Sequence, residues 1–308
     1  MTDTTKHIQN IAVVMTTYNG GSFLKPQIES ILNQSLKPNL FIVCDDGSTD
    51  ETTSILDKYQ ADGQLTWYAN NKQLGVASNF KNAISFVPDG YYFALADQDD
   101  IWDINKLEHS MQQIQVIEEK ELPCLVYSDL RLMNDDGNTL SVSFQNELGH
   151  DKYVHSLDTL LFGNFVLGCT CFCNPTMKMY VAKMPNTTFF NHDAWIALVA
   201  FAIGKAACIK KPLVNYRKHS NNVTISGHIK KTKSQLYKTH LINLFKKNDY
   251  LMERFELVDL FLHAFPNFPS VINLKKLNGF IALRNKSYLH KKIAFEKAFF
   301  GKWLNRFS

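Results

Sequence analysis

Four short apolar runs in the first hundred residues alternate with segments of helical periodicity, and no other feature constrains the fold as strongly. The runs have the length and composition of strands: Ile11–Met15, which reads as a buried parallel strand, Leu40–Cys44, Leu65–Tyr68 and Tyr91–Ala96. Strands and helices that alternate through short loops predict an α/β protein with a doubly wound, mostly parallel sheet flanked by helices.

Three of these strands run directly into polar loops. The first is followed by Thr17-Tyr18-Asn19, the second by the run Asp45–Asp50, and the fourth by Asp97-Gln98-Asp99-Asp100. Because the carboxyl ends of parallel strands meet at one edge of a sheet, the three loops are expected to lie together. The pattern therefore predicts a crevice of the kind that binds nucleotides.

The loop after the fourth strand carries three carboxylates within four positions, Asp97, Asp99 and Asp100. Carboxylates this close repel one another, so the cluster is costly unless a cation lies among them. The alternative is a solvated turn that caps the next helix, with Asp103 or Asn105 as the cap. Convergence with two other polar loops favours a ligand site over the turn.

The charges of the chain are unevenly distributed. From Lys205 onward there are 21 lysines and arginines against 5 acidic residues, which leaves 12 basic and 24 acidic residues in the first 204. A basic, aromatic-rich C-terminal region predicts an anionic surface as its partner, either membrane lipid or a lipid-linked pyrophosphate acceptor. No nucleic-acid motif is visible, so a nucleic-acid partner is not expected.

The composition indicates a globular protein with reduced thiols. The six cysteines show no framework spacing, and the sequence shows no signal peptide and no apolar run near the ~20 residues of a membrane span. These features predict a cytoplasmic protein, with peripheral attachment to the inner face of the membrane as an option. Cys169, Cys171 and Cys173 alternate along an expected strand, Phe165–Phe172. We interpret them as packing residues rather than zinc ligands, because no second Cys or His pair accompanies them.

The later elements follow from periodicity. They are a helix over Lys106–Glu121, strand-like runs at Leu125–Asp129 and Arg131–Met133, a helix that opens with the run Phe189–Trp195 and continues to about Ile203, and strands at Ala206–Ile209 and Leu213–Tyr216. From Gly227 onward the chain is basic and is predicted to be helical.

Taken together, these pieces resemble family 2 glycosyltransferases with the GT-A fold. The matching segments are Thr17–Gly20, Asp45–Asp50, Asn71–Gly75, Ala96–Trp102, Tyr127–Asp129, Asn164–Thr170, His192–Trp195 and Pro212–Val223. The later ones look like the bacterial rhamnosyltransferase-like branch. The resemblance covers about residues 10–225 and implies a GT-A domain over 1–226, with a nucleotide-sugar half at about 10–130 and an acceptor half at 131–226. Residues 227–308 would be a basic helical extension.

The resemblance also implies roles for the polar residues at the sheet edge. By similarity, Thr17, Tyr18 and Asn19 lie against the nucleoside, and Asp46 accepts the N3–H of uracil or thymine. Asp99 would be the main protein ligand of Mg²⁺ or Mn²⁺, with Asp97 beside it, on the metal or on the ribose.

The catalytic base of the family is matched by Asp193. Four neighbours are candidates for contact with the acceptor or the diphosphate: His192, Trp195, Arg217 and His219. For each of them a structural role is also open, as a helix-terminal, core or surface-loop residue.

The resulting hypothesis is an inverting transferase that moves a sugar, with rhamnose as the candidate, from a dTDP- or UDP-sugar to a surface polysaccharide such as O-antigen or capsule, on a lipid-linked acceptor. Two alternatives remain. One is a sugar-phosphate-processing enzyme on the same sheet, which would be expected to carry an N-terminal glycine-rich loop. The other is a catalytically silent sugar- or partner-binding module.

Overall fold

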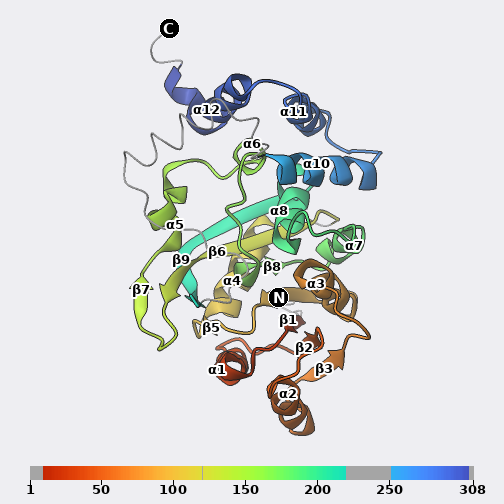
Figure 1. Ribbon diagram of the computed structural model, residues 1–308, viewed down its shortest axis with the longest axis vertical. Coiled ribbons are helices and arrows are strands. Elements are labelled where there is room, and N and C mark those ends of the chain that lie inside the picture. The colour runs from red at the N-terminus through yellow and green to blue at the C-terminus, as the bar shows by residue number, and fades with distance from the viewer. Residues whose placement is uncertain (1–9, 120, 220–250, 305–308) are drawn as a thin grey trace, which may run out of the picture.

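One sheet of nine strands runs through the part of the chain that the computed structural model describes, residues 10–119, 121–219 and 251–304 (Figure 1). The strand order is β3-β2-β1-β4-β8-β6-β9-β5, and β7 pairs with β6. Helices lie on both sides of this curled sheet, as the alternation of the sequence predicts. The architecture is the expected GT-A type of α/β fold.

The N-terminal half of the sheet is entirely parallel, because β1 pairs in parallel with β2 and β4, and β2 with β3. The strands are β1 (Ile11–Thr17), β2 (Leu40–Asp45), β3 (Thr66–Ala69) and β4 (Tyr92–Ala96). The connecting helices are α1 (Gly21–Leu32), α2 (Thr52–Ala61) and α3 (Val76–Ser85). All four predicted strands are confirmed.

The C-terminal half of the sheet is mixed. Two long strands, β6 (Cys124–Met133) and β9 (Lys205–Arg217), pair in parallel. Each replaces two separate runs expected from the sequence, and register shifts on both sides of Asp129 mark where those runs join. The two-residue strand β5 (Ile101–Trp102) pairs antiparallel with β9, so the end of β9 lies directly beside the carboxylate turn.

The predicted strand Phe165–Phe172 is wrong. Only β8 (Phe172–Cys173) pairs, antiparallel with β4 and β6, and Gly168–Thr170 forms a short 3-10 turn. In this turn the N–H and the hydroxyl of Thr170 both donate to the Leu167 carbonyl. Because these groups are used in local hydrogen bonds, they do not pair with a neighbouring strand.

The cysteines of this segment consequently do not face one side. Cys171 and Cys173 pack in the hydrophobic cluster around α8, whereas Cys169 belongs to the cluster on the other face of the sheet.

The remaining helices complete both faces. They are α4 (Lys106–Ile117), α5 (Phe144–Leu148), α6 (Leu157–Leu160), α7 (Met177–Ala182), α8 (His192–Ala202), α10 (Met252–Ala264), α11 (Val271–Ile281) and α12 (Tyr288–Leu304), with β7 at Thr139–Ser141. Helix α4 ends before the predicted Glu121, because Glu118 is already extended.

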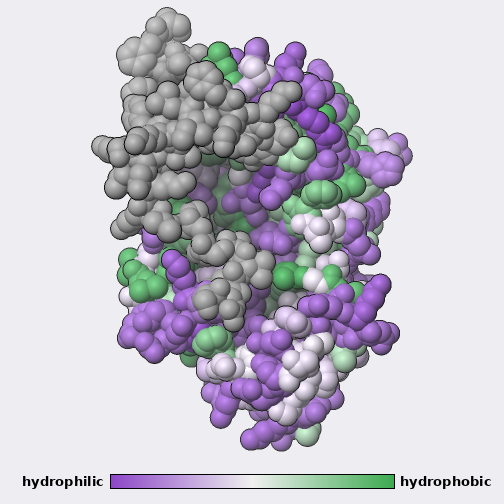
Figure 2. Space-filling model, in the orientation of Figure 1, coloured by the Kyte–Doolittle hydropathy of each residue, from purple (hydrophilic) through white to green (hydrophobic). Residues whose placement is uncertain are grey.

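The C-terminal region is helical where it is described, as predicted, and it lies at the end of the molecule opposite α1 and α2 (Figure 1). Helix α10 packs on α8, with the Phe261 and Trp195 rings 5.7 Å apart. The expected domain boundary at 226 lies outside the described residues. None of the described helices is both long and apolar enough to cross a bilayer. Figure 2 shows a surface that is largely hydrophilic, with scattered hydrophobic residues.

Candidate active site

The polar loops that follow β1, β2 and β4 are joined by hydrogen bonds. The Thr17 hydroxyl donates to Asp45 Oδ1 (2.8 Å), and the Asn19 N–H donates to Ser48 Oγ (2.8 Å). The Tyr18 N–H donates to Gln98 Oε1 (2.9 Å), from the carboxylate turn. The three loops therefore lie together at the carboxyl edge of the parallel strands, as the sequence predicts.

Among the residues expected to contact the nucleoside, Tyr18 and Asn19 have exposed side chains, and Thr17 is buried. Asp46 is buried and anchors the loop before α3: it accepts from the Leu74 N–H (2.7 Å), the Gly75 N–H (2.8 Å) and Asn70 Nδ2 (2.9 Å). A carboxylate offers about four acceptor positions, so one remains for a base N–H. The contact of Asp46 with a base stays a prediction.

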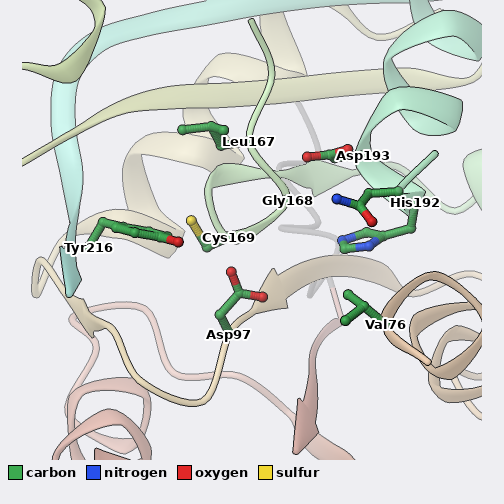
Figure 3. A pocket seen from close by; sticks show the side chains of 9 residues that line it. Val76, Asp97, Leu167, Gly168, Cys169, His192, Asp193 and Tyr216 are labelled. Atoms are coloured by element: carbon green, nitrogen blue, oxygen red, sulfur yellow. The ribbon is translucent and has the colours of Figure 1, made fainter. Parts of the chain in front are cut away.

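The three carboxylates of the turn differ in environment. Asp100 is fully buried, and its Oδ1 accepts from the Arg217 N–H (3.2 Å). Asp99 Oδ2 lies 2.7 Å from His219 Nε2. Asp97 is half-buried and lines a pocket at the sheet edge (Figure 3).

Burial and neighbouring negative charge raise the pKa values of two carboxyl groups in this cluster, Asp97 and Asp100. Burial, followed by the charges of Asp99 and Asp193, raises the pKa of Asp97 to about 7. Burial, together with the charges of Asp99 and Asp97, raises the pKa of Asp100 well above its ordinary value. The turn thus concentrates negative charge that a cation would neutralise.

Arg217 holds the carboxylate turn in place. Its side chain is buried, with Nε donating to the Asp99 carbonyl (3.0 Å) and Nη1 to the Asp135 carbonyl (2.6 Å). The guanidinium also lies 4.9 Å from the centre of the Phe23 ring. These contacts give Arg217 a structural role and leave the diphosphate contact a prediction.

His219 lies against Asp99 and stacks on Phe23, with ring centres 5.1 Å apart. The hydrogen bond to Asp99 raises the pKa of His219.

Asp193 approaches the same pocket from the first turn of α8 (Figure 3). Burial raises the pKa of Asp193 to about 6, against the backbone N–H groups of Ala194 and Gly168 and the positive charge of Arg254. Asp193 and Asp97 therefore face one pocket from two elements that lie almost a hundred residues apart. The resemblance assigned these two carboxylates to one site, and the fold brings them to it.

Two candidate acceptor residues, His192 and Trp195, have different surroundings. His192 lines the pocket, stacks on Phe80 at 3.8 Å, and burial lowers its pKa to about 3, so the imidazole is neutral at physiological pH. Trp195 is fully buried, donates to the Tyr180 carbonyl (3.0 Å) and packs against α10. These contacts give Trp195 a packing role against α10, and its contact with an acceptor stays a prediction.

The pocket has further lining residues that the sequence reasoning did not single out: Val76, Leu167, Gly168, Cys169, Asn191 and Tyr216. For Gly168 a signal existed, because it lies inside a matching segment. A Cβ at Gly168 would meet His192 Nε2 at 2.5 Å, so only glycine lets the chain pass this close to the ring. Tyr216 reaches the site through the pairing of β9 with β6 and β5, which local periodicity does not reveal.

We predict that Gly168→Ala lowers the free energy of unfolding by about 1–3 kcal/mol, because the added methyl group must displace the buried His192 ring. Gly163→Ala is the matched control, since a Cβ there meets nothing within 4 Å and the backbone does not adopt a positive φ. Urea titrations of both variants measure the effect. Equal unfolding midpoints for the two variants would contradict the close packing of Gly168 on His192.

Curated relatives match most of the chain. It is 26% identical to the glycosyltransferase GlyG of Streptococcus pneumoniae over 220 residues, which are 69% of this chain and 72% of that protein. It is 25% identical over 222 residues to TuaG of Bacillus subtilis, a glycosyltransferase named for teichuronic acid biosynthesis (70% and 81%). It is 24% identical over 225 residues to a chondroitin synthase of Pasteurella multocida, covering 72% of this chain and 22% of the synthase.

Solved structures share the fold. TarS of S. aureus in complex with UDP-GlcNAc matches with a TM-score of 0.55 and 16% identity, over 94% of this chain and 79% of that one. The mannosyltransferase PcManGT of Pyrobaculum calidifontis in complex with GDP-Man and Mn²⁺ has a TM-score of 0.55 and 15% identity, over 94% and 72%.

The family model for glycosyl transferase family 2 matches residues 12–120, the segment that contains all three polar loops. The motifs, the fold and the relatives agree: residues 12–120 form a glycosyl transferase family 2 domain, and the chain around them is similar to glycosyltransferases.

Proposed function

We propose that this glycosyltransferase transfers a sugar with inversion from a nucleotide donor to a hydroxyl group, with Asp193 as the general base. The observation that carries the proposal is that Asp193 and Asp97 face one pocket at the carboxyl edge of β1, β2 and β4. In this arrangement the donor lies along the loops, and the acceptor enters beside α8. A silent binding module has no need of both carboxylates in one pocket.

The donor in this proposal is a UDP- or dTDP-sugar. A remaining acceptor position on Asp46 suits the N3–H that uracil and thymine share. Rhamnose is the proposed sugar, on the resemblance of the segments after Tyr127 to the rhamnosyltransferase-like branch. The proposed acceptor is a surface polysaccharide on a lipid carrier, in keeping with relatives named for teichuronic acid and chondroitin synthesis.

The residues at the turn suit a hard divalent cation, Mn²⁺ or Mg²⁺. Asp99 is only partly exposed, and its Oδ2 is oriented by His219. Asp97 lies two positions away, with its pKa raised by burial and by the charges of Asp99 and Asp193. Carboxylate oxygens are the ligands such ions prefer, and one or two suffice when substrate phosphates supply the rest. Such an ion would neutralise the charge that develops on the leaving diphosphate.

The chemistry assigned to the chain itself is proton removal at Asp193. The acceptor hydroxyl attacks the anomeric carbon from the face opposite the diphosphate while an Asp193 oxygen takes the hydroxyl proton. The neutral His192 beside it adds no charge that would compete for that proton. A buried carboxylate with a pKa near 6 is a stronger base than an ordinary aspartate and remains ionised at neutral pH.

Asp193→Asn is predicted to reduce turnover by about 10²–10⁴-fold without weakening donor binding, because the amide keeps the shape but cannot accept the proton. In the unmodified protein at saturating Mn²⁺, kcat/KM should fall as the pH drops below about 6, where Asp193 becomes protonated. Nucleotide release and donor titration measure both effects.

The exposed turn residue Asp136 provides the control, Asp136→Asn, for the loss of one negative charge. If Asp193→Asn retained more than about a tenth of wild-type turnover, the base would lie elsewhere.

Asp99→Asn is predicted to raise the Mn²⁺ concentration needed for half-maximal nucleotide binding at least about tenfold, because one ligand oxygen is lost. Asp136→Asn again serves as the control. Calorimetric titration of Mn²⁺ into protein with UDP or dTDP gives the shift, and an unchanged Mn²⁺ requirement would remove Asp99 from the metal site.

We also propose that the C-terminal helices attach the protein to the cytoplasmic face of an anionic membrane. Along α12 the exposed residues Leu289, Ile293 and Phe300 form one stripe that includes Lys297, while Phe295 packs inward on Phe162. An apolar stripe with lysines beside it suits the interface of a bilayer.

Flotation with vesicles that contain anionic lipid tests this attachment on the full-length chain. The triple substitution of Leu289, Ile293 and Phe300 by serine should abolish flotation. Serine at Val116 and Val142, which are exposed elsewhere, should leave it intact. Flotation of the triple variant at the wild-type level would refute attachment through α12.

A further inference from the structure

A thiol lies among the carboxylates on the inner side of the turn. Ligand atoms of Asp97, Asp100 and Cys169 all lie within 4.8 Å of one another. Asp97 and Asp100 come from the end of β4, and Cys169 from the 3-10 turn that crosses above it (Figure 3). Donor atoms around one tetrahedral cation lie about 3.3–3.8 Å apart, because each is about 2.0–2.3 Å from the metal, so the three atoms are near enough to close on one cation.

One carboxylate of this cluster is poorly paired. Asp100 is fully buried, its Oδ1 accepts from the Arg217 N–H, and its Oδ2 forms no hydrogen bond of ordinary geometry with the residues described. The Cys169 thiol is the donor toward this carboxyl group and lowers its pKa, against the larger effect of burial. Lys106 is buried nearby, but its Nζ lies over the Trp102 ring at 3.7 Å and forms no described ion pair with Asp100. An unpaired carboxylate oxygen in the interior is costly unless it receives a cation or a donor.

The cluster is separate from the Asp99 side of the turn. Asp99 Oδ2 is paired with His219 at 2.7 Å, on the side where Phe23 and Arg217 lie. The turn thus presents two sets of groups: Asp99, paired with the imidazole of His219, and Asp97 with Asp100, whose carboxylates lie near the sulfur of Cys169.

The sulfur decides which cation this second set suits. Mg²⁺ takes oxygen ligands almost exclusively, whereas a thiolate favours Zn²⁺ and its heavier analogue Cd²⁺. Two carboxylates and one thiolate make three protein ligands, which leaves a fourth position for water or a phosphate oxygen.

We propose that Asp97, Asp100 and Cys169 form a second cation site that takes a thiophilic divalent cation such as Zn²⁺, and that its occupation inhibits sugar transfer. Binding forms one metal–sulfur and two metal–oxygen bonds, and the thiol proton together with any proton held by Asp97 or Asp100 is released to solvent. Inhibition follows because Asp97 is withdrawn from the donor side of the turn. This consequence rests on the proposed function, whereas the binding itself does not.

The test is a titration of the full-length protein, without nucleotide, with CdCl₂, followed by the ultraviolet charge-transfer band of the Cd–thiolate bond. We expect a band that saturates at one Cd²⁺ per chain. Cys169→Ser should lose the band and weaken binding at least about tenfold, and Asp100→Asn should weaken binding with the band retained at high Cd²⁺. Cys173→Ser, a fully buried thiol outside the cluster, is the matched control and should behave as wild type. No band in wild type, or an undiminished band in Cys169→Ser, would overturn the site.

A second measurement separates the site from its consequence. Zn²⁺ added to the Mn²⁺-supported reaction should inhibit nucleotide release by the wild-type protein and should inhibit Cys169→Ser at least about tenfold more weakly. Equal inhibition of the two proteins would overturn the inhibitory role. A protein that binds Cd²⁺ through Cys169 but releases no nucleotide from any donor would overturn the proposed transferase function while upholding the site.

Discussion

The parallel pairing of β1 with both β2 and β4 is the constraint on which the rest of the structure depends. Its register places Thr17 opposite Asp45 and Met15 opposite Ala96, so the three polar loops must begin at one level of the sheet. Because the loops begin at the same level, their polar groups are close enough to form hydrogen bonds with one another. The strand pairing that orders one loop therefore also helps to order the other two. Carboxylates that would repel one another in an open chain are held together by buried strands, and this stored repulsion favours the binding of a cation.

The second half of the chain completes the site by long-range pairing. Strand β9 runs the length of β6 and ends beside β5, which brings Arg217, Tyr216 and His219 to the carboxylate turn. Helix α8 enters from the other side with Asp193 in its first turn and Trp195 in the core, and α10 covers it through Phe261. The C-terminal helices are therefore part of the support of α8, so a simple truncation would disturb the helix that carries Asp193.

Local pattern was sufficient for the parallel half of the fold. Strands β1 to β4 and the loops after three of them follow from apolar runs and their polar ends, and Asp97 and Asp193 follow from the family motifs. The failures occurred where partners distant in sequence decide the conformation. Residues 165–172 are apolar enough for a strand, but the self-bonding of Thr170 leaves only Phe172 and Cys173 to pair. Arg217 was expected in a polar loop, whereas it is the last residue of β9 and is buried. The alternation of the three cysteines predicted one shared face, whereas Cys169 lies near the carboxylates.

The central claim is that the edge formed by the three loops binds a nucleotide-sugar and that the chain transfers its sugar. The most direct measurement is nucleotide release from UDP-, dTDP- and GDP-sugars, with Mn²⁺ or Mg²⁺ and with the ion chelated. The account predicts release that depends on the ion and is fastest with a uracil or thymine nucleotide, because the proposed contact is a hydrogen bond from the base N3–H to Asp46, and guanine presents its N–H donors in a different geometry. Absence of ion-dependent release and of ion-dependent nucleotide binding with every donor would contradict it.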